Sequence, residues 1–320
     1  MQTVERDRPQ RRSGLHVVAG VGPVGRSILD ELVDRRLPVR AVVRHQVDDL
    51  PDEVEVVEAD LTDPAVFPQA LAGASVVYHA ASAPYDRWPE LLPPLMRGIV
   101  AGAVACGASI VYADNLYAYG PVAGPLTEDL PSRATGPNGR IRAILAEDLM
   151  DAHAAGSVRA TIGRASDYFG PRGLQSTAGE RLFGRAVAGK PAQVLGNPDL
   201  PHTLTYLPDF GRALVTLGTR EEALGHIWHL PSADTLTYRE FAALVFEALG
   251  RPLKLQVMPP ALLAVAALLS PTLRAVHEQG YQRNAPWIVD HSKFARAFGA
   301  DVTPHREAIA TTTAWFSRLA

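Results

Sequence analysis

A glycine-rich segment near the N-terminus has the residue types and spacing needed to bind a phosphate group. The segment Gly-Val-Gly-Pro-Val-Gly at 20–25 directly follows an apolar run at 15–19 and directly precedes a helix-like stretch. Glycines permit a tight turn and close backbone approach, and the helix start offers unpaired N–H groups to a pyrophosphate. We therefore predict a dinucleotide-binding turn, with a plain glycine-rich turn as the alternative. The predicted contact residues are Gly20, Gly22, Pro23, Val24 and Gly25.

The second apolar run, 39–43, ends at Arg44, nineteen positions after Gly25. An acidic residue at this place would hold a ribose 2′-hydroxyl group, whereas an arginine pairs with a 2′-phosphate. Arg44 thus favours NADP(H) over NAD(H) as the cofactor. If Arg44 is only a solvated charge at a strand end, the preference stays open.

The elements that must position these residues alternate in type along the chain. Short β-rich runs separated by amphipathic stretches predict an α/β fold, a Rossmann doubly wound parallel sheet with helices on both faces. Ligands of such sheets bind beyond the carboxyl ends of the strands. The expected strands lie near 15–19, 39–43, 54–58, 75–79, 109–113 and 158–163, and the expected helices near 24–36, 64–72, 88–105 and 137–155.

The chain divides into unequal parts after residue 172, where the alternation weakens. We expect a disordered tail at 1–13, a dinucleotide-binding Rossmann domain at 14–172 and a smaller C-terminal substrate lobe at 173–320. Segments 204–230 and 290–320 resume regular structure and should return to the Rossmann domain, so the lobe is discontinuous. The apolar stretch Ala261–Leu269 is about half as long as a membrane span requires. We therefore expect it to be buried in the core of the lobe and not to cross a membrane.

Five segments in order resemble the motifs of the extended short-chain dehydrogenases/reductases, the NAD-dependent epimerase/dehydratase-like group. The segments are Val57–Thr62, His79–Ser82, Val111–Gly120, Arg164–Pro171 and Tyr206–Arg212. The resemblance extends from Leu15 to the C-terminus. It implies that Asp60, followed by Leu61, contacts adenine, and that a turn of small residues lies under the cofactor. The residues of that turn are Ala80, Ala81 and Ser82.

This chain departs from the family at the positions that carry the redox chemistry. The family uses a Ser or Thr together with a Tyr-x-x-x-Lys pair, in which lysine lowers the pKa of the tyrosine for proton transfer. Here Asn115, Asn138 and Arg142 stand at those three positions. Asparagine has no ionisable proton, and arginine stays charged and cannot shuttle one. The standard proton relay is therefore predicted to be missing.

Other roles are open to the replacing residues. Arg142 is expected to hydrogen-bond cofactor hydroxyl groups, unless it pairs at the surface with an acid such as Glu147. Asn115 is a candidate catalytic residue whose amide N–H polarises a substrate carbonyl, or else a turn residue at a strand end.

Three further residues are candidates for the substrate cleft. Tyr117 is the second catalytic candidate, and Tyr168 is expected to contact substrate, although tyrosines near strand ends are more often packing groups. His202 is expected to reach the cleft from the lobe, or to be a plain loop histidine.

The leading functional hypothesis is an NADPH-dependent ketoreductase of a hydrophobic substrate such as a polyketide. Such an enzyme is similar in kind to the relay-lacking reductases that tailor aromatic polyketide antibiotics, such as the simocyclinone ketoreductase. One alternative is a non-catalytic NADP(H)-binding sensor or regulator. Another is a sugar-nucleotide epimerase or dehydratase, whose diphosphate would require cations such as Arg172, Arg181 and Arg185.

Composition removes several other classes of function. The formal net charge of −3, from charges spread along the chain, gives no basic footprint for nucleic acid. One cysteine, Cys106, excludes an internal disulfide, and ten histidines show no metal-ligand spacing. We therefore expect a cytoplasmic monomer or homodimer that binds a small-molecule substrate, no metal, no nucleic acid and no membrane.

Overall fold

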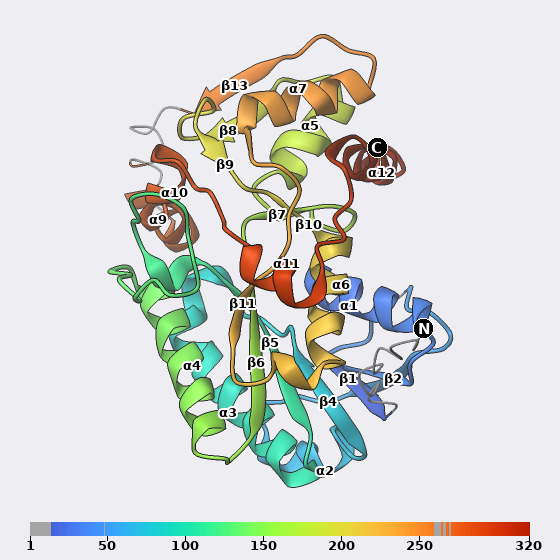
Figure 1. The fold of residues 1–320 in the computed structure, drawn as a ribbon. Coiled ribbons are helices and arrows are strands. Elements are labelled where there is room, and N and C mark those ends of the chain that lie inside the picture. Colours follow the sequence, from blue (N-terminus) through green and yellow to red (C-terminus); the bar gives the residue numbers. More distant parts are fainter. Residues whose placement is uncertain (1–13, 48, 259–263, 265–266, 269) are drawn as a thin grey trace, which may run out of the picture.

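A seven-stranded parallel sheet forms the centre of the computed structural model, which describes residues 14–47, 49–258, 264, 267–268 and 270–320. Its strand order is β11-β6-β5-β4-β1-β2-β3 (Figure 1). The chain leaves β1 for β2 and β3 on one side, then crosses to β4 on the other. This reversal opens a crevice at the carboxyl ends of β1 and β4. The strands are β1 (Leu15–Ala19), β2 (Val39–Val43), β3 (Glu55–Glu58), β4 (Ala74–His79), β5 (Ser109–Asn115), β6 (Arg159–Ala165) and β11 (Ile227–His229).

The predicted Rossmann-type α/β fold is confirmed, and the first six strands lie where the apolar runs predicted them. β11 is a seventh strand beyond the six expected, and it pairs in parallel with β6. Residues 227–229 of segment 204–230 thus belong to the sheet.

Helices cover both faces of the sheet, so that successive residues of a strand are buried on opposite sides. In β1, Val17 belongs to the core under α3 and α4, whereas Val18 belongs to the core under α1 and α6. On the first face lie α2 (Phe67–Ala70), α3 (Trp88–Cys106) and α4 (Pro137–Ala154), and on the second α1 (Pro23–Asp34), α6 (Leu207–Gly218) and α11 (Ser292–Phe298).

A separate aromatic core holds the smaller lobe together, with Phe169, Phe183, Phe241 and Phe316 at its centre. The lobe lies beyond the carboxyl ends of the sheet strands (Figure 1). Its helices are α5 (Arg185–Val187), α7 (Tyr238–Ala248), α9 (Pro271–Glu278), α10 (Tyr281–Asn284) and α12 (His305–Ser317), and its strands are β7 (Tyr168–Phe169), β8 (Ala192–Leu195), β9 (Pro201–His202), β10 (Thr205–Tyr206), β12 (Leu236–Thr237) and β13 (Leu255–Met258). Short turns of other helix types are η1 (Pro64–Val66), η2 (Tyr85–Arg87), η3 (Tyr117–Tyr119), η4 (Gly179–Gly184) and η5 (Glu221–Ala223).

The C-terminal segment 290–320 behaves differently from expectation. α11 contacts β11 and so returns to the sheet, whereas α12 packs against α7. The buried face of α12, with Ile309 and Phe316, belongs to the lobe core, which explains this placement.

Two expectations concern residues that the structure describes only in part. The tail 1–13 lies outside the described residues. So does most of the apolar stretch 261–269, in which Ala267 is buried and Leu268 is exposed. Within the described ranges, no helix is both long enough and apolar enough to cross a membrane.

Candidate functional site

A cleft of about 680 Å³ lies at the carboxyl ends of the sheet strands, where the strand order reverses. Residues that directly follow β1 and β4, together with residues of β2, β5 and β6, meet residues of the lobe along its walls. Gly25 and His202 do not line it. The cleft brings together the other site residues expected from the sequence: Gly20, Gly22, Pro23, Val24, Arg44, Asp60, Leu61, Ala80, Ala81, Ser82, Asn115, Tyr117, Arg142 and Tyr168.

The glycine turn leaves open space only on its cleft side. A Cβ on Gly20, whose φ is +90°, would lie 2.4 Å from the Cα of Ala81, and a Cβ on Gly25 would lie 1.9 Å from the carbonyl oxygen of Gly20. A Cβ on Gly22 would meet nothing within 4 Å. Gly22 also caps α1 without a side-chain hydrogen bond, so the helix start stays available to a ligand. This turn fits the diphosphate of a dinucleotide. Gly25 lies on the side away from the open space, where it packs against the backbone of Gly20.

The neighbouring strand ends place a cation beside an anion at the mouth of the cleft. Arg44 is exposed and follows β2. Asp60 accepts hydrogen bonds from the backbone N–H of Thr62 (3.0 Å) and from its hydroxyl group (2.8 Å). These bonds, together with the nearby charge of Arg44, lower the pKa of Asp60. Asp60 is therefore ionised and fixed beside Arg44.

Arg142 is buried behind the cleft and does not pair with Glu147. Its Nη1 donates to the hydroxyl oxygen of Tyr112 (2.7 Å) and to Asp114 Oδ1 (3.3 Å). Arg164 Nε donates to the other oxygen of the same carboxylate (2.9 Å). Two guanidinium groups thus share one carboxylate, while burial raises the pKa of Tyr112 to about 12 and keeps it neutral. The Nε of Arg142 is buried without a hydrogen-bond partner among the described residues.

The two asparagines of the altered relay have different surroundings. Asn138 is buried outside the cleft lining, and its Nδ2 donates to the backbone oxygen of Tyr85 (2.9 Å). Asn115 lines the cleft, and its Oδ1 accepts from the backbone N–H of Tyr117 (3.0 Å). Because that bond uses the amide oxygen, the NH₂ group of Asn115 is the part that can donate.

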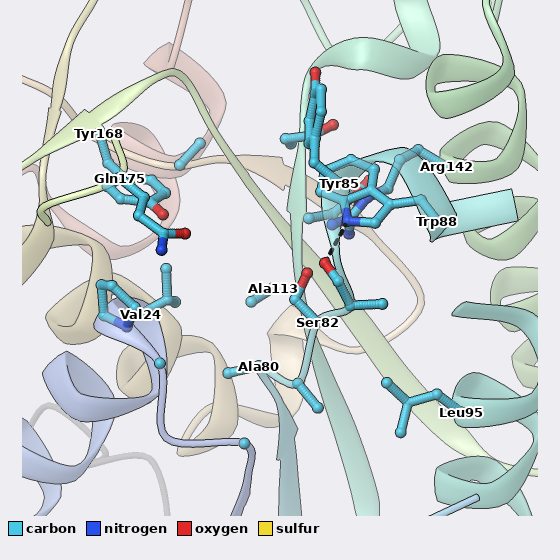
Figure 2. A pocket seen from close by; sticks show the side chains of 18 of the residues that line it. Val24, Ala80, Ser82, Tyr85, Trp88, Leu95, Ala113, Arg142, Tyr168 and Gln175 are labelled. Carbon is cyan, nitrogen blue, oxygen red and sulfur yellow. Dashed lines mark hydrogen bonds and ion pairs between the residues drawn. The ribbon is translucent and has the colours of Figure 1, made fainter. Parts of the chain in front are cut away.

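Three aromatic side chains form one wall of the cleft, which we call the aromatic wall: Tyr85, Trp88 and Tyr117. The ring of Trp88 lies 4.8 Å from that of Tyr85 and 6.0 Å from that of Tyr117, and Arg142 Cζ lies 4.3 Å from the Trp88 centroid. Trp88 is fixed by its Nε1 donor to the oxygen of Ala83 (3.0 Å) (Figure 2). Burial, with the neighbouring Tyr85 and Asp167, raises the pKa of Tyr117 well above its usual range, so it remains a phenol.

The opposite wall comes from β7 and the segment that follows it. Tyr168 and Gln175 lie across the cleft from Tyr85, Trp88 and Arg142 (Figure 2). Asp167 lines the cleft beside them. Burial alone would raise the pKa of Asp167, but the hydrogen bond from His202 and its charge lower the pKa overall.

The expectation that His202 reaches substrate is wrong for this structure. His202 is buried in β9 behind Asp167, with Nε2 3.1 Å from Asp167 Oδ2. The β9–β12 pairing holds it there, and its hydrogen-bond partners Asp167 and Gln282 line the cleft.

Sequence reasoning missed Tyr85, Trp88 and Asp167. Tyr85 begins η2 and Trp88 begins α3, in a segment without a motif, and no sequence signal identifies them. Asp167 had a signal, because it stands where the family motif Arg-x-x-Asn has asparagine.

Comparison with known proteins bears on the cofactor and the fold. A family model described as NAD(P)H-binding matches residues 20–133. This part of the chain is an NAD(P)H-binding domain. No curated protein matches the chain by sequence.

Solved structures extend the likeness to the whole fold. UDP-glucose 4-epimerase from Thermotoga maritima aligns with a TM-score of 0.78 at 17% identity, covering 95% of this chain and 99% of that chain. UDP-glucuronic acid 4-epimerase from Bacillus cereus, in complex with NAD, gives 0.76 at 15% identity, covering 95% and 99%. A double mutant of dTDP-glucose 4,6-dehydratase from Streptomyces venezuelae gives 0.75 at 18% identity, covering 94% and 96%. At these identities the likeness establishes the fold and leaves the reaction to be argued from the site.

Proposed function

We propose that this chain is an NADPH-dependent ketoreductase that acts on a hydrophobic carbonyl substrate without a tyrosine–lysine relay. The observation that carries the proposal is the cleft itself, in which a dinucleotide-binding turn faces an aromatic wall. Asn138 and Arg142 stand where the relay would be, and neither side chain can transfer a proton as the tyrosine does.

The residues of the cleft fit NADP(H). The turn around Gly22 would hold the diphosphate, Arg44 would pair with the 2′-phosphate, and Arg142, which lines the cleft, would donate to a hydroxyl group of the ribose. The bound cofactor would supply a hydride. The preference for NADPH rests on Arg44, since an acidic residue there would repel the 2′-phosphate.

The charges around the cleft favour an uncharged substrate over a sugar nucleotide. Neither Arg172, Arg181 nor Arg185 is among the residues that line the cleft. Arg172 instead lies within 3.5 Å of Asp30 and Asp49. The ionised Asp167 at the substrate end would repel a diphosphate. An aromatic or polyketide carbonyl compound would instead pack against the aromatic wall.

Positioning supplies much of the rate enhancement in this mechanism. The NH₂ group of Asn115 would donate to the substrate carbonyl oxygen, and the phenol of Tyr117 would hold the substrate beside it. Well-oriented reactants gain about 7–11 kcal/mol relative to free encounter. A reductase that fixes its substrate against the wall therefore needs less help from acid catalysis.

The direct test mixes the purified protein with NADPH and a panel of aromatic ketones and follows the loss of nicotinamide absorbance. Consumption of NADPH with formation of the alcohol supports the reductase. The missing relay also motivates the sensor hypothesis, which predicts that NADPH is bound and never consumed. Thermal stabilisation by a UDP-sugar or a dTDP-sugar, without turnover of ketones, would instead favour the epimerase or dehydratase.

A further inference from the structure

The histidine behind the substrate wall has hydrogen-bond acceptors at both ring nitrogens. Nδ1 of His202 lies 3.2 Å from the backbone oxygen of Gln282, and Nε2 lies 3.1 Å from Asp167 Oδ2. A backbone carbonyl only accepts, and an ionised carboxylate only accepts. A neutral imidazole carries one N–H and can satisfy one of these two partners. The geometry therefore calls for one additional proton on the His202–Asp167 pair.

A second buried histidine shows the contrasting arrangement. Nδ1 of His229 lies 3.1 Å from the backbone oxygen of Asp290, but Nε2 lies 2.8 Å from the hydroxyl group of Tyr119, which can donate. A neutral His229 satisfies both partners, and burial together with the charge of Arg164 lowers its pKa to about 4. The two histidines differ in the partner of Nε2, which is a carboxylate for His202 and a hydroxyl group for His229.

Groups from every neighbouring element bear on the charge of the pair. Burial and the charge of Asp167 raise the pKa of each tyrosine that faces it, so these tyrosines stay neutral. Arg283 of α10 and the hydroxyl group of Thr177 favour the ionised carboxylate. The two acceptors at the ring nitrogens of His202 place the additional proton on the imidazole. The tyrosines are Tyr85 in η2, Tyr117 in η3, Tyr168 in β7, Tyr238 in α7 and Tyr281 in α10.

We propose that the His202–Asp167 pair is the proton source that replaces the missing tyrosine, with Asp167 touching the substrate and His202 acting through it. This inference rests on the proposed ketone reduction. A reduced nicotinamide delivers a hydride, with two electrons, to the carbonyl carbon, and the π electron pair of the C=O bond moves to oxygen. That oxygen takes the proton of the pair through the Asp167 carboxyl group. The His202 N–H bond breaks as an O–H bond forms on Asp167, and that O–H bond breaks as the substrate O–H bond forms. A proton from the solvent later returns to the neutral imidazole.

The proton on the pair can be measured without turnover. NMR of the full chain, labelled with nitrogen-15 in its histidines, should find both ring nitrogens of His202 protonated at neutral pH. His229 in the same sample is the internal control and should be a neutral imidazole. In Asp167→Asn, the new amide can donate to Nε2, so His202 should become neutral. A neutral His202 in the wild-type chain would overturn the proposal.

Kinetics test the acid role. Asp167→Asn should lower kcat/KM for ketone reduction by about 10²–10⁴-fold, the usual contribution of a general acid, while calorimetric NADPH affinity stays within about threefold. Wild-type activity should fall as rising pH removes the proton of the pair, and His202→Gln should abolish that alkaline limb. An Asp167→Asn protein with near wild-type kcat/KM would overturn the proposal and leave the reductase intact. A chain that carries the charged His202 and binds NADPH but reduces no carbonyl would instead overturn the reductase, and the acid role with it.

Discussion

Asp114 forms ion pairs with two buried arginines, Arg142 and Arg164, at the carboxyl end of β5. The carboxylate lies 3.3 Å from Arg142 Nη1 and 2.9 Å from Arg164 Nε, and its side chain is fully buried. The guanidinium of Arg142 is thereby fixed under the aromatic wall instead of being free to move protons. A lysine at this position has one point charge and could not make the same planar contacts.

Removing the shared carboxylate should therefore be costly. Asp114→Asn leaves two buried guanidinium groups without a counter-charge, and we expect a loss of about 3–5 kcal/mol in the free energy of unfolding. Denaturant unfolding measures this, with Glu90→Gln as the control because its ion pair with Arg87 is solvent-exposed. The control should leave the midpoint nearly unchanged. A wild-type midpoint for Asp114→Asn would mean that Asp114 does not carry the compensating charge.

Arg44 provides the second test at the residue scale. Arg44→Asp should weaken NADPH binding at least about tenfold, the value of a charge-assisted hydrogen bond, and should affect NADH much less. Calorimetric titration of both cofactors into both proteins gives the comparison. Equal losses for NADPH and NADH would remove the basis for the 2′-phosphate contact.

Sequence could identify site residues only where a motif fixes both type and place. Gly22, Arg44 and Asp60 could be assigned to the cleft from the sequence because each stands shortly after a strand end. Tyr85 and Trp88 reach the cleft because the turn before α3 folds over it, and a tertiary contact of this kind leaves no periodic signal. The burial of His202 also depends on pairing between β9 and β12, which are far apart in the chain.

At the scale of elements, substitutions in the turn between β1 and α1 can distinguish an effect on cofactor binding from an effect on the stability of the fold. Gly22→Ala places a methyl group in open space on the cleft side, so the fold should keep its thermal midpoint. NADPH affinity should nevertheless fall by tenfold or more, since the methyl group occupies the space of the diphosphate. Gly25→Ala is the matched variant: its Cβ would collide with the oxygen of Gly20, so the chain should lose stability as well as binding. A Gly22→Ala protein with unchanged affinity would place the diphosphate elsewhere.

The strands that sequence predicted well are those buried on both faces. β1, β2 and β5 are nearly continuous apolar runs flanked by helices, and such runs identify a parallel sheet. The strands of the lobe have two to four residues and pair across long separations, as β8 does with β13. Amphipathicity shows that one face of α12 is buried but does not reveal that α7 covers it, which explains why the sequence assigned α12 to the sheet.

At the scale of the whole molecule, two histidines couple stability to pH. Burial lowers the pKa of His79 to about 3 and that of His229 to about 4, from an ordinary value of 6.5. Below that ordinary value these two histidines bind protons in the unfolded chain but remain neutral in the folded chain. Their contribution to stability is therefore present above about pH 6.5 and is lost as the pH falls toward the folded values.

Thermal unfolding between about pH 7 and pH 5 should show this dependence, with each histidine contributing a slope of at most about 1.4 kcal/mol per pH unit. His79→Gln and His229→Gln should each reduce the slope, whatever their effect on the midpoint at neutral pH. A slope unchanged in both variants would show that these histidines are not buried in the neutral form.

The same overall fold serves epimerases and dehydratases of nucleotide sugars, so the fold alone does not choose a reaction. The choice depends on a small set of side chains: an aromatic wall, an ionised Asp167, and Asn138 and Arg142 in place of a tyrosine–lysine pair. All of them act only if a nicotinamide dinucleotide occupies the cleft.

Calorimetric titration of the wild-type chain with NADPH and with NADH tests that requirement most directly. We predict one NADPH per chain, bound more tightly than NADH. No heat of binding from either dinucleotide would contradict the account at its base.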